Sequence, residues 1–569
     1  MIAEALKLPP GASLIGRPLA LVEALTSARG RSQQLEVIRA YWRVTMAVGE
    51  YRLRMDESEH LRRLTSPRAE DATVLRTARA SAAAAERSAE REAVRGQHEL
   101  AEVAGLSTAL PLPLPADLPL VGSYLTGFEN VYASRNLPPR VRLIDRVLPV
   151  RLEAIEKRTA AVQAAGDALD AVAEAYASGQ ADLWSFLACL ADCGRQRQAL
   201  LAEVCQYNQD IAEYALTVLG ASVSARDLVA KLIKPTNAAP RGPAPEPGRQ
   251  EPTPAPPRRP GTQGYPSAAA PLAPQARPDA TDSLPPGAAQ RTANRLMMEG
   301  PAGSGFSGAL YSALSMATPA VRTKELCQAL HAERTPPPQP GEAIGLRDCL
   351  ARIPASLRRS VLDAFWLARQ RAAECQALVA EENQLAELAP VAMERGSRPG
   401  GAVEGLRLRA ARLAAEADSR QSQARLLEAR FELTRSVGRP LDREWLLPTT
   451  PPHAGYYLLK LEAQPPQVTE SRAVQRLATV IPALSETLQE RATAVVEADS
   501  ARAAATATYQ GGNRPIDPLL PCTRQQTMET LGFLETLTAY NRAIAEYVLT
   551  VVPSSISADQ LVQTLVVSN

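Results

Sequence analysis

Aromatic residues are scarce in this chain of 569 residues: Phe, Trp and Tyr together make up 4% of it. A thick globular core needs more bulk than this, because large side chains supply most of the area that a core buries. Alanine and arginine recur throughout instead. The composition therefore argues against ordinary compact domains and favours thin layers of helix.

A net charge of one sign is also missing. The 63 basic and 61 acidic residues leave a formal charge of +2, so no overall field attracts nucleic acid or an acidic membrane surface. Arginine-rich stretches such as RLRMDESEHLRRL are interspersed with acids. We expect no nucleic-acid partner.

Clustered cysteines and histidines are absent from the sequence. The seven cysteines form no CxxC pair, so neither a disulfide framework nor a zinc site is indicated. Cys189 and Cys193 lie one helical turn apart with no histidine beside them, and we interpret them as small apolar residues of a helix seam. The four scattered histidines form no triad. We expect no enzyme activity, no metal and no cofactor.

Long apolar runs and export signals are missing too. No uninterrupted apolar stretch approaches the roughly 18 residues of a membrane-spanning helix. The first residues, MIAEALKLPPGASLIG, lack a basic region followed by an apolar one. The sequence as given shows no export signal or membrane anchor, which leaves a cytoplasmic location open.

A phosphate-binding loop is not indicated either. GPAGSGFS from Gly300 has the glycine spacing of such a loop, but Phe306 stands where the lysine belongs. No apolar strand precedes it. We interpret this segment as the end of a flexible linker.

Proline, in contrast, is abundant, and 16 of the 47 prolines fall between Pro235 and Gly287. Few large apolar residues accompany them, so this stretch has nothing to fold around. We expect residues 235–305 to be a disordered linker between two domains, residues 1–234 and 306–569.

The two regions that flank the linker are diverged copies of one unit. AYW at residues 40–42 recurs as AFW at 364–366, and YNQDIAEYALTV from Tyr207 recurs as YNRAIAEYVLTV from Tyr540. From the second helix onward, the spacing between matching residues stays equal to that between Tyr207 and Tyr540. A constant spacing over so long a stretch indicates an internal duplication.

Each copy is predicted to contain four long helices. In the first copy they cover residues 33–64, 72–104, 149–177 and 182–219. Apolar residues step by three and four along the third and fourth, which is typical of a coiled-coil seam. The predicted fold class is all-α, with long antiparallel coiled-coil hairpins.

The seam of the second helix is lined mainly by alanine, from Leu75 to Leu100. Small residues let helix axes approach closely, but each buries little apolar area. We infer that an isolated unit is marginally stable. Packing against its sister unit or against other chains would complete it.

The connections between the helices are of two kinds. TSPRAED and ASGQAD close helical hairpins, and Asp71 and Asp182 are expected to cap the helices that follow. LPLPLPADLPLVGSYLTGFENVY, residues 110–132, contains too much proline for a helix. We expect it to cross the side of the bundle in extended form, as a belt.

Two combined motifs carry a family resemblance. The first is an alanine-rich helix that ends in EL....G before a Leu-Pro segment, seen in HELAEVAGLSTALPLPLP and FELTRSVGRPLDREWLLP. The second is a hairpin with Y..G at its tip and a YN..IA.YAL close, which begins at AYASGQAD. Over most of both copies the chain thus resembles the TolC-like outer membrane efflux proteins.

The resemblance implies a trimeric, tapered tunnel of long helices that carries small molecules or polypeptides across the periplasm, seated in the outer membrane by a β-barrel. Its hairpin tips would face a periplasmic adaptor and an inner-membrane pump. The residues expected at these tips are Ser66, Pro67, Ser178, Gly179, Gly396, Gly400, Gly511 and Gly512.

The chain departs from this family where barrel strands belong. There the sequence passes from the belt almost directly into the third helix, through RVRLIDRVLPVRLEAI. The alternative hypothesis is therefore a non-transporting coiled-coil scaffold or interaction protein, derived from that family.

Two pairs of residues at matching positions of the copies are candidates for a ligand site. Trp42 and Trp366 could line a cleft, but at seam positions we expect them to be packing anchors. Glu50 and Glu374 could pair with arginines across the bundle, and a solvated helix face is the favoured alternative.

Overall fold

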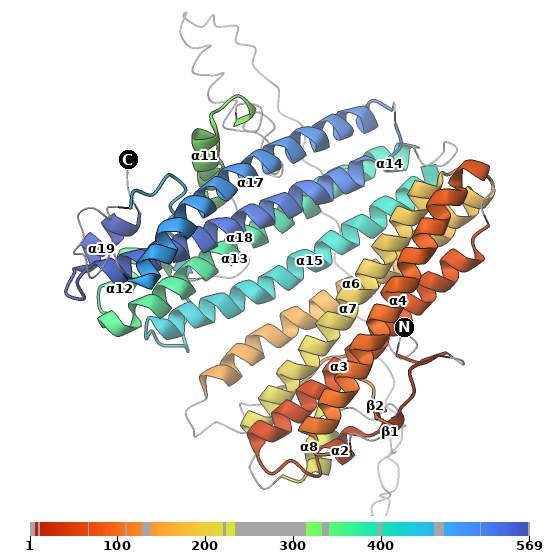
Figure 1. The fold of residues 1–569 in the computed structure, drawn as a ribbon, viewed down its shortest axis with the longest axis horizontal. Coiled ribbons are helices and arrows are strands. Elements are labelled where there is room, and N and C mark those ends of the chain that lie inside the picture. Colours follow the sequence, from red (N-terminus) through yellow and green to blue (C-terminus); the bar gives the residue numbers. More distant parts are fainter. Residues whose placement is uncertain are drawn as a thin grey trace, which may run out of the picture. The chain divides into compact units, whose positions relative to one another are not determined.

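The computed structural model describes residues 6–9, 12–65, 68–107, 111–127, 138–219, 223–233, 314–332, 341–395, 401–459, 471–512 and 514–566. Within these residues the fold is all-α, as predicted: helices make up nearly all of the regular structure (Figure 1). The only strands in this part of the chain form two short pairs. Residues 235–305, the expected linker, lie outside the described residues.

Four long helices form the first copy: α3 (Arg31–Arg63), α4 (Ala72–Val103), α6 (Pro139–Ala177) and α7 (Leu183–Val218). α3 packs against α4, and α6 packs against α7, as two hairpins. Three of the four helices begin and end within two residues of the predicted positions. Regular apolar spacing flanked by turn residues was enough to place them.

The third helix begins ten residues before the predicted start, at Pro139 instead of Pro149. Pro139 occupies the first turn, where its missing N–H is not needed. Pro149 then lies inside the helix, at a cost of about 3 kcal/mol. Burial of the preceding turns offsets this cost, since Ile144 and Leu148 are each only 2% exposed. The prediction was wrong because it interpreted an internal proline as a helix start.

Only one of the two expected caps is formed. The Asp182 carboxylate accepts a hydrogen bond of 2.7 Å from the backbone N–H of Ser185, at the start of α7. Asp71 precedes α4 but makes no such bond. Its carboxylate accepts a hydrogen bond of 2.9 Å from the Tyr176 hydroxyl instead, and so ties the two hairpins together.

The second copy contains α13 (Arg358–Glu387), α14 (Ala389–Arg395), α15 (Gly401–Ser436), α17 (Arg472–Gln510) and α18 (Leu519–Val551). Both ends of α17 correspond to the ends of α6 in the spacing of the repeat. α17 also contains a proline, Pro482, at the position equivalent to Pro149. α13 and α14 together take the place of α3.

Shorter helices complete the described residues: α2 (Leu21–Ala24), α8 (Ala225–Leu232), α11 (Pro319–His331), α12 (Leu346–Leu350), α19 (Ala558–Leu565) and the 3-10 turns Ala69–Asp71 and Ala355–Leu357. α8 and α19 also begin and end at equivalent residues of the two copies. Each follows a serine whose hydroxyl accepts a backbone N–H, which is a typical helix cap.

Over its described residues, 111–127, the proline-rich belt contains no helix, as predicted, and part of it is an extended strand. Its segment β2 (Pro113–Pro115) pairs in parallel with β1 (Arg17–Leu19). In the second copy β4 (Leu447–Pro448) pairs in parallel with β3 (Ala343–Ile344). Proline is tolerated because each sheet has only two strands, which leaves one side of every strand without a partner.

A repeated asparagine holds the belt against the last long helix of each copy. Asn208 accepts a hydrogen bond from the backbone N–H of Leu120 (2.8 Å) and donates one to its carbonyl (2.9 Å). Asn541 makes the same two bonds to His453, at 2.8 and 2.9 Å. The tyrosine before each asparagine also donates to a belt carbonyl. The tyrosine and asparagine of the YN..IA.Y motif therefore hold the belt in place, and they are here called the belt clamp.

Residues Met1–Lys234 and Gly303–Asn569 form one compact unit. Its eight long helices follow one another in space in the order α4, α3, α7, α6, α15, α13, α18, α17. The two copies meet where α6 packs against α15, a contact as extensive as those inside the hairpins (Figure 1). α4 and α17 are the two edges of this series.

Candidate functional site

The candidate functional site is the contact between the two copies, where α6 packs against α15, here called the junction. At its belt end, α6 and α15 pack through a cluster of buried apolar side chains. The buried members of this cluster are Leu143, Val147, Ala424, Leu427, Phe431 and Trp445. Both copies contribute to it, so this core forms only when the copies are together.

Ion pairs follow the apolar cluster along the same two helices. Glu153 of α6 pairs with Arg420 of α15 at 2.9 Å, and Lys157 pairs with Glu416 at 2.6 Å. These pairs are partly exposed, so each contributes little stability by itself. Their main effect is to fix the register of the two helices.

Nearer the hairpin turns, five charged side chains from five helices form a continuous chain of ion pairs, here called the junction network. In order they are Glu203 (α7), Arg158 (α6), Asp418 (α15), Arg524 (α18) and Glu381 (α13). Arg158 contacts Glu203 at 3.1 Å and also pairs with Asp418. Arg524 contacts Asp418 at 2.9 Å and Glu381 at 3.1 Å. Two arginines thus alternate with three carboxylates.

Burial gives these carboxyl groups unequal acidities. It raises the pKa of Glu203 to about 7 and that of Glu381 to about 7, although Arg158 and Arg151 oppose the effect at Glu203 and Arg524 opposes it at Glu381. For Asp418, the positive charges of Arg158 and Arg524 outweigh burial and lower the pKa. The network is electrically neutral when one of the two glutamates holds a proton, a condition met near neutral pH.

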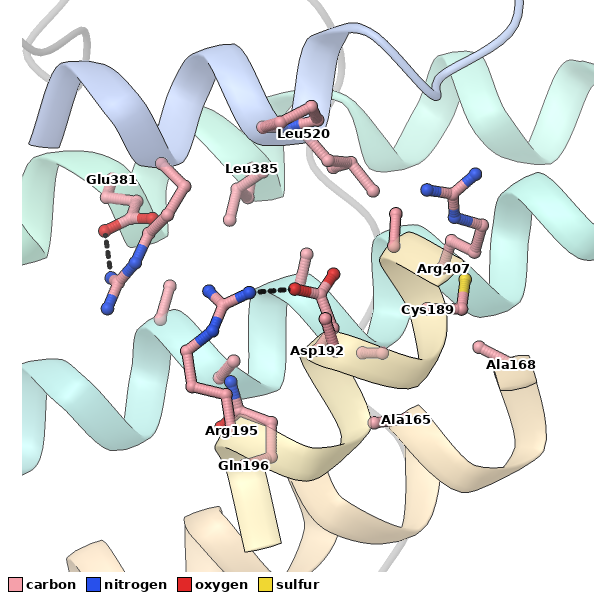
Figure 2. A pocket seen from close by; sticks show the side chains of 18 of the residues that line it. Ala165, Ala168, Cys189, Asp192, Arg195, Gln196, Glu381, Leu385, Arg407 and Leu520 are labelled. Carbon is pink, nitrogen blue, oxygen red and sulfur yellow. Dashed lines mark hydrogen bonds and ion pairs between the residues drawn. The ribbon is translucent and has the colours of Figure 1, made fainter. Parts of the chain in front are cut away.

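A groove with a volume of about 420 Å³ opens beside the junction network (Figure 2). Its walls come from α6, α7, α13, α15 and α18, so both copies line it. The apolar surface is mostly alanine: Ala165, Ala168, Ala188, Ala191, Ala410, Ala411, Ala414 and Ala415. Short side chains on adjoining helices leave the space that larger residues would fill.

The charged residues around the groove are all engaged in ion pairs. Arg407 pairs with Asp517, and Arg195 pairs with Asp192. Glu381 contacts Arg524, as described above. The arrangement offers a shape for apolar groups, and no free base lies beside a nucleophile among these lining residues. Its apolar surface is suited to packing against or binding apolar groups.

The hairpin turns, where the sequence placed its candidate site residues, are only partly described. Ser178 and Gly179 lie between α6 and α7, and Gly511 and Gly512 lie between α17 and α18. Gly179 and Gly512 both have a φ of +76°, a left-handed conformation that favours glycine. The remaining predicted tip residues, Ser66, Pro67, Gly396 and Gly400, lie outside the described residues.

Contacts bring the turns of all four hairpin connections to one end of the unit. Arg68 donates to the carbonyl of Gly179 at 2.9 Å. Arg395 donates to the carbonyl of Tyr509 at 2.9 Å. The Ser185 hydroxyl donates to Asp517 at 2.8 Å and so connects the first copy to the second. The described residues at these turns are therefore linked to one another.

Trp42 and Trp366 are packing anchors, as predicted. They are 1% and 2% exposed. Each ring meets that of the preceding residue, Tyr41 or Phe365, edge-on with centroids 5.2 Å apart. Neither tryptophan lines the groove.

Glu50 and Glu374 do not pair with arginines across the bundle in the part of the chain that the structure describes. Glu50 accepts a hydrogen bond of 2.8 Å from Gln198 of α7. Glu374 is only 7% exposed, so the expected solvated face is wrong for this copy. Its carboxylate is satisfied by Gln370 and Arg371 on its own helix.

The other candidate residues do not form a chemical site in the described chain. Cys189 and Cys193 are buried, and burial raises the pKa of both thiols. No group of three His, Cys, Asp or Glu side chains within the described ranges could hold a metal ion. The GPAGSGFS segment lies outside the described residues. Among the described helices, none is both long enough and apolar enough to cross a membrane.

The junction network was not predicted from the sequence. Its members are separated by tens of residues and come from both copies, so no local pattern connects them. One signal was available: Asp418 interrupts the small-residue stretch RLAAEADSRQSQA, where a charge facing a helix seam demands a partner.

The fold and the junction thus define an all-α protein built of repeated helical hairpins. Comparison of the chain with family models, with curated proteins and with solved structures finds no match. The function must therefore be argued from the geometry.

Proposed function

We propose that the chain is a wall unit of a helical tunnel of the TolC-like type, which conducts small molecules or polypeptides across the periplasm and the outer membrane. The observation that carries this proposal is the series of eight long helices, whose edges α4 and α17 have no further long helix beside them in the described residues. Further copies of the chain would continue such a series.

The packing of the helices supports a wall and not a filled core. Seams lined with alanine bury little area per residue, so each helix needs neighbours on both sides. A closed ring of chains provides such neighbours for every helix. By analogy with the TolC-like proteins, the ring would be a homotrimer.

The hairpin turns supply a place for partners. Because the four connections lie at one end and contact one another, a ring would present them as one rim. On the same analogy, this rim would meet a periplasmic adaptor and an inner-membrane pump. The protein would then be located in the outer membrane or the periplasm.

A second candidate function is that of a non-transporting scaffold. The specific observation in its favour is the alanine-lined groove at the junction. Its charged residues are already paired, so the remaining apolar surface could accept side chains of a docked helix without leaving a buried charge unpaired.

A transport assay in the native host tests the first proposal. Deletion of the gene should raise the cellular accumulation of fluorescent efflux substrates several-fold, and the wild-type gene on a plasmid should restore export. Fractionation of the same cells should recover the protein with the envelope. Unchanged accumulation together with recovery only in the cytosol would exclude transport and leave the scaffold.

A further inference from the structure

The outer faces of α4 and α17 carry exposed stripes along most of their length. On α17 the stripe consists of Arg476, Val480, Ala483, Glu486, Thr487, Glu490, Glu497 and Ala501. On α4 it consists of Thr73, Thr77, Ala80, Ala84, Arg87, Arg91, Val94 and His98. α11 packs against α17 through the Arg322–Thr493 hydrogen bond, but it leaves this stripe exposed.

The chain itself shows how these two faces can meet. In the spacing of the repeat, which relates Tyr207 to Tyr540, α17 is the counterpart of α6 and α4 is the counterpart of α15. α6 and α15 are in contact within one chain, at the junction described above. Each pair of residues in contact at that junction therefore has an equivalent pair, with one residue on the outer face of α17 and the other on the outer face of α4.

Two residues of the junction's apolar cluster have apolar counterparts on the two outer faces, whereas Leu143, Ala424 and Phe431 correspond to Arg476, Arg91 and His98. Val147 of α6 and Leu427 of α15 belong to the same buried cluster. Their equivalents are Val480 and Val94. Both valines are 36% exposed and are among the large apolar side chains that the described surface leaves in solvent. Bringing the two faces together in the same register would bury them against each other.

One ion pair of the junction is preserved in the same register. Glu153 pairs with Arg420 at the junction, and the equivalent residues are Glu486 and Arg87, with the signs preserved. Glu486, Glu490 and Glu497 form no ion pair among the described residues. The α4 stripe contains Arg87 and Arg91, and Arg87 also pairs with Glu90 on its own helix. These arginines and the acids of the α17 stripe carry opposite charges.

We infer that α17 of one chain docks against α4 of a second copy, in the register of α6 and α15. This contact, here called the α17–α4 seam, is heterologous: the two copies use different surfaces, and each chain keeps one of each free for a further copy. This inference deepens the proposed function, because a closed ring of chains requires a contact between copies. It rests on the proposed function only for the presence of several copies.

The seam lacks several ion pairs of the junction. Lys157 and Glu416, which pair there, correspond to Glu490 and Ala83. The positions equivalent to Asp418 and Arg524 are Ala85 and Ala191, so the buried ion pairs are not repeated. What remains is a narrow apolar contact with charges around it. Exposed charges are screened by salt, so the association should weaken as the salt concentration rises.

Cysteine pairing tests the register and the heterologous geometry together. In a Cys522→Ser background, which removes the one described cysteine that is not buried, Val94→Cys and Val480→Cys are made as separate proteins. Mixed under oxidising conditions, they should form a covalent dimer that a reducing agent dissolves. Either protein alone should form little dimer, because residue 94 of one chain does not face residue 94 of another, and the same holds for residue 480.

Charge reversal provides an independent measurement. Glu486→Arg and Arg87→Glu should each raise the dissociation constant about tenfold or more in sedimentation, because like charges then face each other. The double variant should recover most of the affinity. Glu535→Arg, an exposed acid on α18, is the matched control and should have no effect.

The outcomes separate this inference from the proposed function. If the wild-type chain is monomeric, or if the oligomer forms but the mixed cysteine proteins do not link, the α17–α4 seam is wrong. If the seam links but electron microscopy shows open filaments without an axial channel, the seam stands and the tunnel is excluded.

Discussion

Two buried glutamates determine how the junction responds to pH. The pKa values of Glu203 and Glu381 are raised to about 7, while Asp418 between the two arginines has a lowered pKa. Between pH 4.5, the ordinary value for a glutamate, and pH 7, the folded chain therefore binds more protons than the unfolded one. Stability should fall as the pH rises through this window and level off above it.

Substitution of one glutamate makes this expectation measurable. Glu381→Gln cannot ionise, so the loss of unfolding free energy between pH 5 and pH 8 should shrink by about 1–3 kcal/mol. Urea unfolding at the two pH values measures it. Glu387→Gln, an exposed residue of the same helix, should leave the pH dependence unchanged. An equal slope in wild type and Glu381→Gln would contradict the assignment.

The belt clamp gives a second prediction for a single residue. Asn208 is 2% exposed, and its amide satisfies both backbone groups of Leu120. Asn208→Ala would leave these partly buried groups without partners, which should lower the free energy of unfolding by about 1–3 kcal/mol. The neighbouring Gln209→Ala should cost less than about 1 kcal/mol. Similar losses for both variants would show that the clamp is not specific.

At the scale of single helices and turns, a glycine at the end of α6 can be compared with one inside the same helix. Gly179 has a φ of +76° at the end of α6, whereas Gly166 lies inside the same helix with open space around it. Gly179→Ala should destabilise the protein by about 1 kcal/mol, and Gly166→Ala should stabilise it by about 0.5–1 kcal/mol. Thermal unfolding followed by circular dichroism gives both values. The two substitutions should change the stability in opposite directions, so changes of both in the same direction would contradict this interpretation.

Elements with local signals were predictable, and contacts between distant segments were not. α4 is bounded by a turn rich in proline and polar residues and by a glycine, Gly105, with a φ of +63°, so local residues determine both of its ends. The start of α6 depends on tertiary burial that outweighs the penalty of Pro149, which no local pattern reveals. The junction network is harder still, because it joins five helices.

At the scale of the whole molecule, the strength of the junction decides whether the copies act as one body. A protease site placed in the segment Pro235–Ala302 would allow the chain to be cut between the copies. The two pieces should still co-elute in high salt, because the apolar cluster and the buried ion pairs are little affected by screening. Arg158→Ala leaves buried carboxylates without their partner, so its cut pieces should separate.

The asymmetry between the junction and its counterpart follows from joining two copies covalently. Removing Asp418 and Arg524 from water is unfavourable, and inside one chain this happens once, when the polypeptide folds. On a surface that meets other molecules, the same dehydration would recur at every encounter. Alanines at the equivalent positions avoid that barrier. Fusion of the copies thus permits a permanent line of buried charge at the junction, and the proposed α17–α4 seam would form and dissociate without burying such charges.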